Sequence, residues 1–132
     1  MKTLKQNFTD YFDKIYLLTM ANRKERKNSV LKQFKTIGIY DELMNSGKFE
    51  IVETVALPIT QHALNCMGTS GDISFTYNND EQRIGQFMCA SEHYKMIKRS
   101  LINNYERILI LEDDVCFIKE FNYIMKALEE AP

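Results

Sequence analysis

The sequence lacks the features that would place it at once among membrane, secreted or duplex-binding proteins. No apolar run approaches the roughly 18 residues of a membrane span, and the segment from Met1 to Asp13 has no apolar signal core. With 17 basic and 18 acidic residues the net charge is -1, so the excess of Lys and Arg that duplex-binding proteins usually carry is missing. We therefore expect a cytoplasmic protein with no transmembrane segment that binds no nucleic acid.

Cysteine and glycine patterns of several common site types are also missing. The three cysteines include no Cys-x-x-Cys pair and cannot all pair, so we expect reduced, mostly buried thiols. His62 and Cys66 are four residues apart, but two ligands are too few for a zinc site. No glycine-rich phosphate loop and no nucleophile elbow is present, which argues against Walker A, dinucleotide and serine-hydrolase sites.

What the sequence does contain is one domain, residues 1–132, with an ordinary globular composition of 45% apolar and 27% charged residues. Three segments have the pattern of strands. Lys14–Thr19 and Arg107–Leu111 are mostly apolar runs, typical of strands buried on both faces of a parallel sheet. Phe49–Val55 alternates apolar and polar residues, as half-buried strands do.

Helical patterns separate these strands. We expect Asn22 to cap a first helix, with Glu25 three residues later, and Gly38 to end it. A long helix is predicted from Glu81 to about Asn103 and a final one over 119–130. One apolar face of the long helix carries Phe87, Ala90, Ser91, Tyr94, Ile97 and Leu101. The order of elements predicts an open, mainly parallel α/β sheet flanked by helices, with a loop over 56–80 that leaves room for a short helix near Ala63.

The most informative motif is Glu112-Asp113-Asp114, directly after the third predicted strand. Open α/β sheets bind ligands beyond the carboxyl ends of their strands. Three adjacent carboxylates repel one another unless a cation lies among them, and oxygen ligands suit Mg²⁺ or Mn²⁺. The alternative is a solvated acidic turn, or a helix cap formed by Asp114.

Two further segments carry candidate binding residues. The helix expected after the first strand would present backbone N–H groups to an anion, and Arg23 and Arg26 would add charged contacts to phosphate. The alternative for these arginines is a solubilising helix surface. On the long helix, Cys89 and Ala90 are small enough for close packing on the sheet, while His93 either faces a ligand or makes a structural hydrogen bond.

In this order, the three segments resemble the family 25 glycosyltransferases, the lipopolysaccharide and lipooligosaccharide enzymes related to the collagen galactosyltransferases. The acidic segment 111–115 is identical to the family's Leu-Glu-Asp-Asp-Val. Segment 85–93 is similar to the family's Gly-Glu-x-Gly-Cys-x-x-Ser-His, with Gln86 in place of an acidic residue and Glu92 in place of the serine. The strand 15–18, Arg23 and Arg26 correspond to the family's opening strand and arginine-containing helix.

The resemblance implies a GT-A type fold and a metal-dependent transfer of galactose or glucose from a UDP-sugar to a glycan or lipooligosaccharide acceptor. It places the protein in the cytoplasm or peripherally at the inner membrane. Glu112 and Asp114 would hold Mn²⁺ or Mg²⁺; no residue is assigned as the catalytic base. Nucleotide-sugar contacts would come from Thr19, Asn22, Arg23, Arg26, His93 and Asp113. Because the family's chains continue beyond the acidic motif, we expect only the donor-binding half here. The alternatives are a short member of the family, a gene fragment, or a half that a partner chain or a homo-oligomer completes.

Two other functions stay open at this point. One is a non-catalytic module with a GT-A-like fold that binds a nucleotide or a partner protein. The other is a receiver-like domain, in which a strand ending in Glu-Asp-Asp binds Mg²⁺. In receivers that strand opens the domain, whereas here it comes near the end of the sequence, which makes this the weaker alternative.

Overall fold

The structure is a computed structural model that describes residues 7–54, 80–117 and 121–132. The predicted loop over 56–80, the helix suggested near Ala63 and the pair His62 and Cys66 therefore lie almost entirely outside the described residues. None of the described helices has the length and hydropathy of a membrane span.

Three parallel strands form the sheet. Strands β1 (Lys14–Met20), β2 (Phe49–Thr54) and β3 (Ile108–Glu112) are arranged in the order β2-β1-β3, so the first strand of the chain is the central one. The register places Leu17 opposite Ile51 on one side and Leu111 on the other. The open α/β fold is confirmed, and the described strand ends fall within one residue of the predicted ones.

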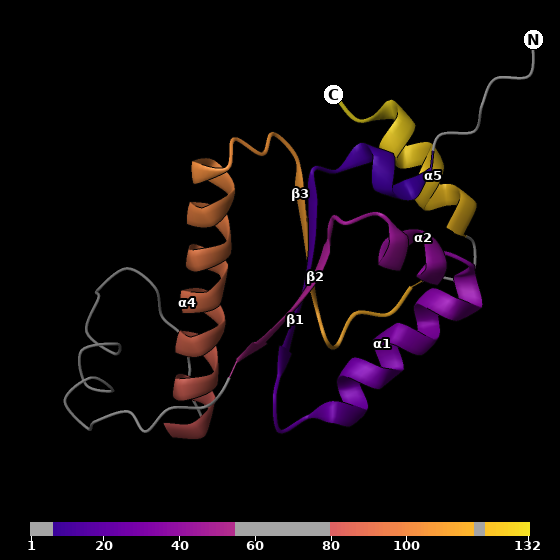
Figure 1. The fold of residues 1–132 in the computed structure, drawn as a ribbon. Coiled ribbons are helices and arrows are strands. Elements are labelled where there is room, and N and C mark those ends of the chain that lie inside the picture. The colour runs from indigo at the N-terminus through magenta and orange to yellow at the C-terminus, as the bar shows by residue number, and fades with distance from the viewer. Residues whose placement is uncertain (1–6, 55–79, 118–120) are drawn as a thin grey trace, which may run out of the picture.

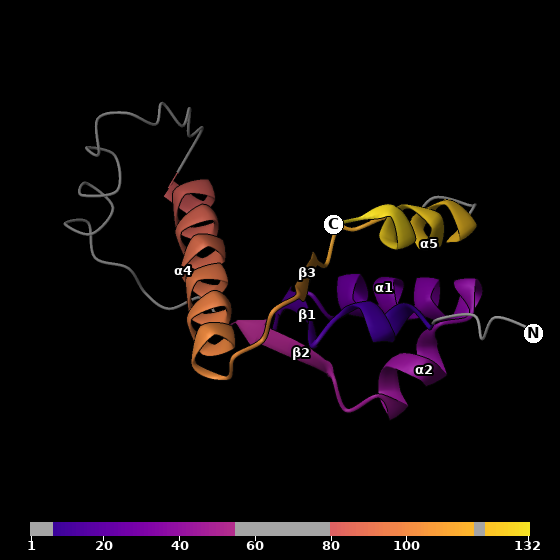
Figure 2. The same cartoon turned by 90° about the horizontal axis from the view of Figure 1, so that it is seen from above.

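The helices lie in two layers on opposite faces of this sheet (Figure 1 and Figure 2). On one face lie α1 (Lys24–Ile37), α2 (Tyr40–Asn45) and α5 (Phe121–Glu130), and on the other lies α4 (Asp80–Ile102). The alternation of side chains along β1 explains this. Its odd-numbered residues face the core that contains α1 and α2, and its even-numbered residues face α4.

The larger core lies between β1 and α1. Ile15 and Leu17 contact the buried side chains of Val30 and Phe34. Gly38 ends α1 in the left-handed conformation, with φ 82°, as the sequence predicted. The short helix α2 and the 3₁₀ turn over 8–11 also cover this core, and neither was predicted from the sequence.

The predicted cap of α1 is wrong. The helix begins at Lys24 with Arg23 at the N-cap, and no side chain caps it. The N–H of Arg23 donates to the carbonyl of Met20 at 3.0 Å, which closes a turn with Asn22 inside it. Asn is favoured in such turns, so its side chain sits one residue too early to cap the helix.

The predicted apolar face of α4 is not the face that packs on the sheet. Met96, 1% exposed, and Ser100 are the buried residues of this helix, and Cys89 packs beside Met96. Of the two small residues expected to pack on the sheet, Cys89 does so and Ala90 is exposed. The predicted apolar residues Phe87, Tyr94, Ile97 and Leu101 are exposed.

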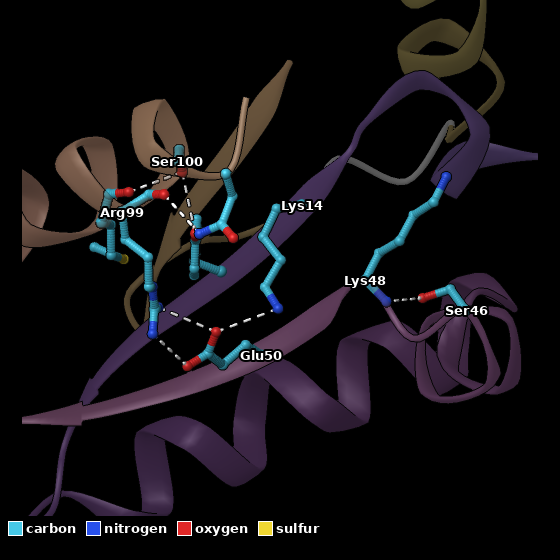
Figure 3. Close-up of polar contacts among 9 residues, drawn as sticks. Lys14, Ser46, Lys48, Glu50, Arg99 and Ser100 are labelled. Atoms are coloured by element: carbon cyan, nitrogen blue, oxygen red, sulfur yellow. Dashed lines mark hydrogen bonds and ion pairs between the residues drawn. The ribbon is translucent and has the colours of Figure 1, made fainter. Parts of the chain in front are cut away.

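Polar contacts fasten the C-terminal half of α4 to the sheet (Figure 3). The guanidinium of Arg99 donates to both carboxylate oxygens of Glu50 at 3.1 Å, and Lys14 approaches the same carboxylate at 3.3 Å. Arg99 also lies over the ring of Tyr16, whose hydroxyl shares a 3.1 Å hydrogen bond with Ser100. These contacts orient the helix more than they stabilise it, since the ion pairs are partly exposed.

A carboxylate closes the connection between α4 and β3. Asp13 accepts hydrogen bonds from the backbone N–H groups of Arg107 at 3.0 Å and Glu106 at 2.7 Å. These two backbone donors, that of Arg107 first, hold the pKa of Asp13 below its ordinary value.

The two faces of α4 predict unequal costs of truncation. Met96→Ala is expected to lower the free energy of unfolding by about 2–5 kcal/mol, because it leaves a cavity against the sheet. Leu101→Ala, on the exposed face, is expected to change it by less than about 0.5 kcal/mol. Urea denaturation followed by circular dichroism measures both. Equal losses of unfolding free energy would contradict the assignment of Met96 to the buried face of α4.

Asp13→Asn is expected to lower the melting temperature at neutral pH. Because the folded-state pKa is lowered, the charge stabilises the fold above the unfolded pKa of about 4, and this is lost as the pH falls through the folded-state value. The difference from wild type should therefore shrink in acid. Glu106→Gln, an exposed neighbour whose backbone is one of the two donors, is the control. A difference that persists unchanged in acid would contradict the role of the charge.

Candidate functional site

The candidate site lies at the carboxyl ends of β1 and β3, where open α/β sheets bind ligands. Thr19 is near the end of β1, and Glu112 is the last residue of β3. A turn follows, in which the N–H of Val115 donates to the carbonyl of Glu112 at 3.1 Å. The sheet therefore brings the acidic motif beside the loop that leads into α1.

Asp113 joins the ends of β1, β3 and α1. Its Oδ2 accepts a 2.9 Å hydrogen bond from the hydroxyl of Thr19, and its Oδ1 lies 3.7 Å from Nη1 of Arg26. The Asp113 side chain is 13% exposed, against 47% for Arg26. Three of the predicted site residues, Thr19, Arg26 and Asp113, thus form one cluster. The Asp113 side chain is largely buried in it, whereas that of Arg26 is open to solvent.

Glu112 joins β3 to α4. Its Oε1 lies 3.0 Å from Nε2 of His93 and accepts a hydrogen bond from the Cys89 thiol at 3.4 Å. Sγ, Nε2 and a carboxylate oxygen of these three residues all lie within 4.8 Å of one another. The contact places His93 beside the acidic motif. Cys89 was not predicted as a site residue, although its spacing of four from His93 places both on one face of a helix.

The Cys89 thiol is held in its protonated form. Burial, followed by the hydrogen bond to Glu112 and the charge of that carboxylate, raises the pKa of Cys89 to about 11. The charges of Asp114 and Asp113 act in the same direction. The raised pKa thus has two causes, burial of the thiol first and the nearby carboxylates second.

A cavity of about 120 Å³ opens among these residues, between the acidic motif and α4. Arg23, Thr54, Cys89, Glu112 and Asp113 are among the residues that line it. Sites for drug-sized ligands occupy about 300–1,000 Å³. The described residues therefore enclose space for one charged group or ion, and a larger ligand would extend beyond them.

Two predicted residues lie apart from these clusters. Among the described residues, the side chains of Asn22 and Asp114 have no hydrogen-bond partner, and both residues are exposed. The three-donor cluster contains Glu112 but not Asp114. Accessible carboxylates on Glu112 and Asp114 still have the oxygen chemistry that Mg²⁺ and Mn²⁺ take, so the donor set fits the predicted ion.

Comparisons with known proteins place the chain among sugar transferases. The family model described as "Glycosyltransferase family 25 (LPS biosynthesis protein)" matches residues 12–132. Procollagen galactosyltransferase 2 of Homo sapiens is 28% identical over 120 residues, which are 89% of this chain and 18% of the human protein. The Mus musculus protein of the same name is 26% identical over 121 residues, with 90% and 18% covered. The chain thus spans less than a fifth of the length of these relatives. No solved structure matches it significantly.

The raised pKa of Cys89 predicts slow alkylation. At pH 8 a thiol with a pKa of about 11 is ionised in about one molecule in a thousand. Iodoacetamide, in the presence of a chelator, should therefore modify Cys89 far more slowly than the exposed Cys116. Glu112→Gln should accelerate the reaction at Cys89 and leave that at Cys116 unchanged. Peptide mass spectrometry separates the two sites, and equal rates in the wild-type protein would refute the prediction.

Proposed function

The chain belongs to glycosyltransferase family 25, and from this premise we propose that it binds a UDP-sugar in a metal-dependent transfer of galactose or glucose to a glycan or lipooligosaccharide acceptor. The observation that carries the proposal is the way the sheet holds the acidic motif. Thr19 and Arg26 fix Asp113, and His93 and Cys89 fix Glu112, all at the edge where such sheets bind ligands.

In this proposal the arginines receive the diphosphate. Arg23 lines the cavity beside Glu112 and Asp113, and Arg26 is held by Asp113 at the start of α1. The backbone N–H groups at this helix start add to the attraction for an anion. Asp113 limits the positions that the Arg26 guanidinium adopts, so less side-chain entropy is lost when phosphate binds.

The exposed carboxylates have a different task. Glu112 and Asp114 would hold Mn²⁺ or Mg²⁺, which when bound offsets the charge that develops on the departing diphosphate. Asp113, already bonded to Thr19 and Arg26, keeps the two flanking residues on a fixed turn. The GT-A architecture, the donor and the acceptor remain parts of the proposal.

One observation favours a second candidate, a module that binds without turnover. Five large hydrophobic side chains of α4 are exposed, of which Leu101 at 71% and Ile102 at 72% are the most exposed. Apolar surface of this kind is typical of contacts with another chain or another copy. A protein that binds a nucleotide and a partner, with transfer carried out elsewhere, would have both features. A galactose- and glucose-transfer assay separates this candidate from the first.

Calorimetry of UDP and UDP-galactose, with and without Mn²⁺, tests the donor site. Binding that depends on the metal is expected. Glu112→Ala and Asp114→Ala should each weaken it by about 100-fold or more, because even residues that only support a metal ligand are worth about 10–100-fold. Glu129→Ala, an exposed acidic residue on α5, is the matched control. Metal-dependent affinity that is unchanged in both site variants would overturn the assignment of the ion ligands.

A further inference from the structure

The cluster of Cys89, His93 and Glu112 has a chemistry that the proposed donor site does not use. An ion held by Glu112 and Asp114 would have oxygen ligands only, whereas this cluster offers sulfur, nitrogen and oxygen from two elements. We propose that these three residues form a site for a thiophilic divalent ion, Zn²⁺ above all. The proposal goes beyond the transferase function and holds whether or not the chain binds a UDP-sugar.

The distances between the donor atoms are close to those that zinc requires. In tetrahedral sites zinc lies at about 2.3 Å from sulfur and about 2.0–2.2 Å from nitrogen and oxygen, so its donors are about 3.3–3.7 Å apart. The oxygen of Glu112 lies 3.0 Å from Nε2 of His93 and 3.4 Å from Sγ of Cys89. The two α4 donors lie within 4.8 Å of each other. Small side-chain adjustments, at most little more than about 1 Å between the two α4 donors, bring all three into range.

The backbone around the cluster is fixed in advance. Cys89 and His93 are four residues apart on α4, one above the other on the face toward β3. Glu112 is the last residue of a strand that pairs along its length with the central strand. Cys89 also packs against the buried core around Tyr16 and Met96. Ligands on helices and strands hold their geometry more precisely than ligands on loops.

The donor set selects the ion. Thiolate and imidazole ligands favour zinc over Mg²⁺ and Mn²⁺, which take oxygen ligands. Binding replaces the hydrogen bond from Cys89 to Glu112, and the thiol proton passes to solvent. Asp113, beside Glu112, adds negative charge that favours a cation. Three protein ligands leave the fourth position open toward the cavity that Cys89 and Glu112 line, as in zinc sites that bind an exogenous ligand.

The shared carboxylate has a consequence for the rest of the site. Glu112 is a ligand in both the zinc site proposed here and the site proposed for Mn²⁺ or Mg²⁺. When Glu112 binds zinc together with Cys89 and His93, it is no longer available to bind Mn²⁺ or Mg²⁺ together with Asp114. Zinc is therefore expected to compete with the harder ion.

Cobalt titration of the metal-free protein tests the proposal, because Co²⁺ occupies zinc sites and a cobalt–thiolate bond gives a near-ultraviolet charge-transfer band. One equivalent of Co²⁺ per chain should produce the band, and Zn²⁺ should remove it. Cys89→Ser should abolish the band, and His93→Ala should weaken cobalt binding by about 10-fold or more. The chain has only two other cysteines, so Cys66→Ser and Cys116→Ser are matched controls that should keep the band.

Each outcome bears on this proposal separately from the transferase function. Absence of a band in the wild-type protein, or a band that persists in Cys89→Ser, would overturn the zinc site. A band that disappears in Cys116→Ser would assign the thiolate elsewhere and overturn it as well. Circular dichroism of each variant confirms the fold. Cobalt binding is measured without nucleotide, and UDP binding is measured with Mn²⁺ and without zinc. One proposal can therefore be refuted while the other stands.

Discussion

The pairing of β1 with a parallel strand on each side is the constraint on which the rest of the structure depends. A strand in this position has no face open to water and no unpaired edge, so its residues must be apolar on both faces. Residues 15–18 meet that demand and are all buried. Because β1 is central, its odd residues assemble the α1 core and its even residues seat α4. Its last residues then fix where the acidic motif and the arginines meet.

The acidic motif shows how a small sheet accommodates adjacent carboxylates. Each of the first two is tied to a different element, Asp113 to β1 and α1, and Glu112 to α4. These contacts point the two carboxylates in different directions. Their mutual repulsion is therefore reduced, although the negative charge of the motif remains. Burial first, and then the hydrogen bond to Glu112 and the remaining negative charge, raise the pKa of Cys89. The same arrangement therefore attracts cations and protects a thiol from ionisation.

Much of the fold was predictable from local patterns, and the misses have a common cause. Strands β1 and β3 were evident because apolar runs of that length suit only buried strands. The N-cap of α1 was predicted at Asn22, one residue before the observed N-cap at Arg23. Asn is common both at N-caps and in turns, so the local sequence does not distinguish the two positions. The packing face of α4 was missed because it combines one large apolar residue, Met96, with the polar or small Ser100 and Cys89, while other large apolar residues of the helix are exposed. Cys89 was missed at the site because Glu112, 23 residues away, becomes its neighbour only when β3 joins β1.

The position of β1 has a further consequence for how the protein is made. The carboxylate of Asp13 and the amide of Arg107 that it binds are 94 residues apart, and β3 follows directly. Contacts of such separation are late and slow to form, because a long stretch of chain must be closed first. On the ribosome, the apolar residues of β1 stay without one of their two partner strands until the long segment up to β3 has been translated. The strand that organises the folded protein is thus the segment for which a nascent chain most needs a chaperone.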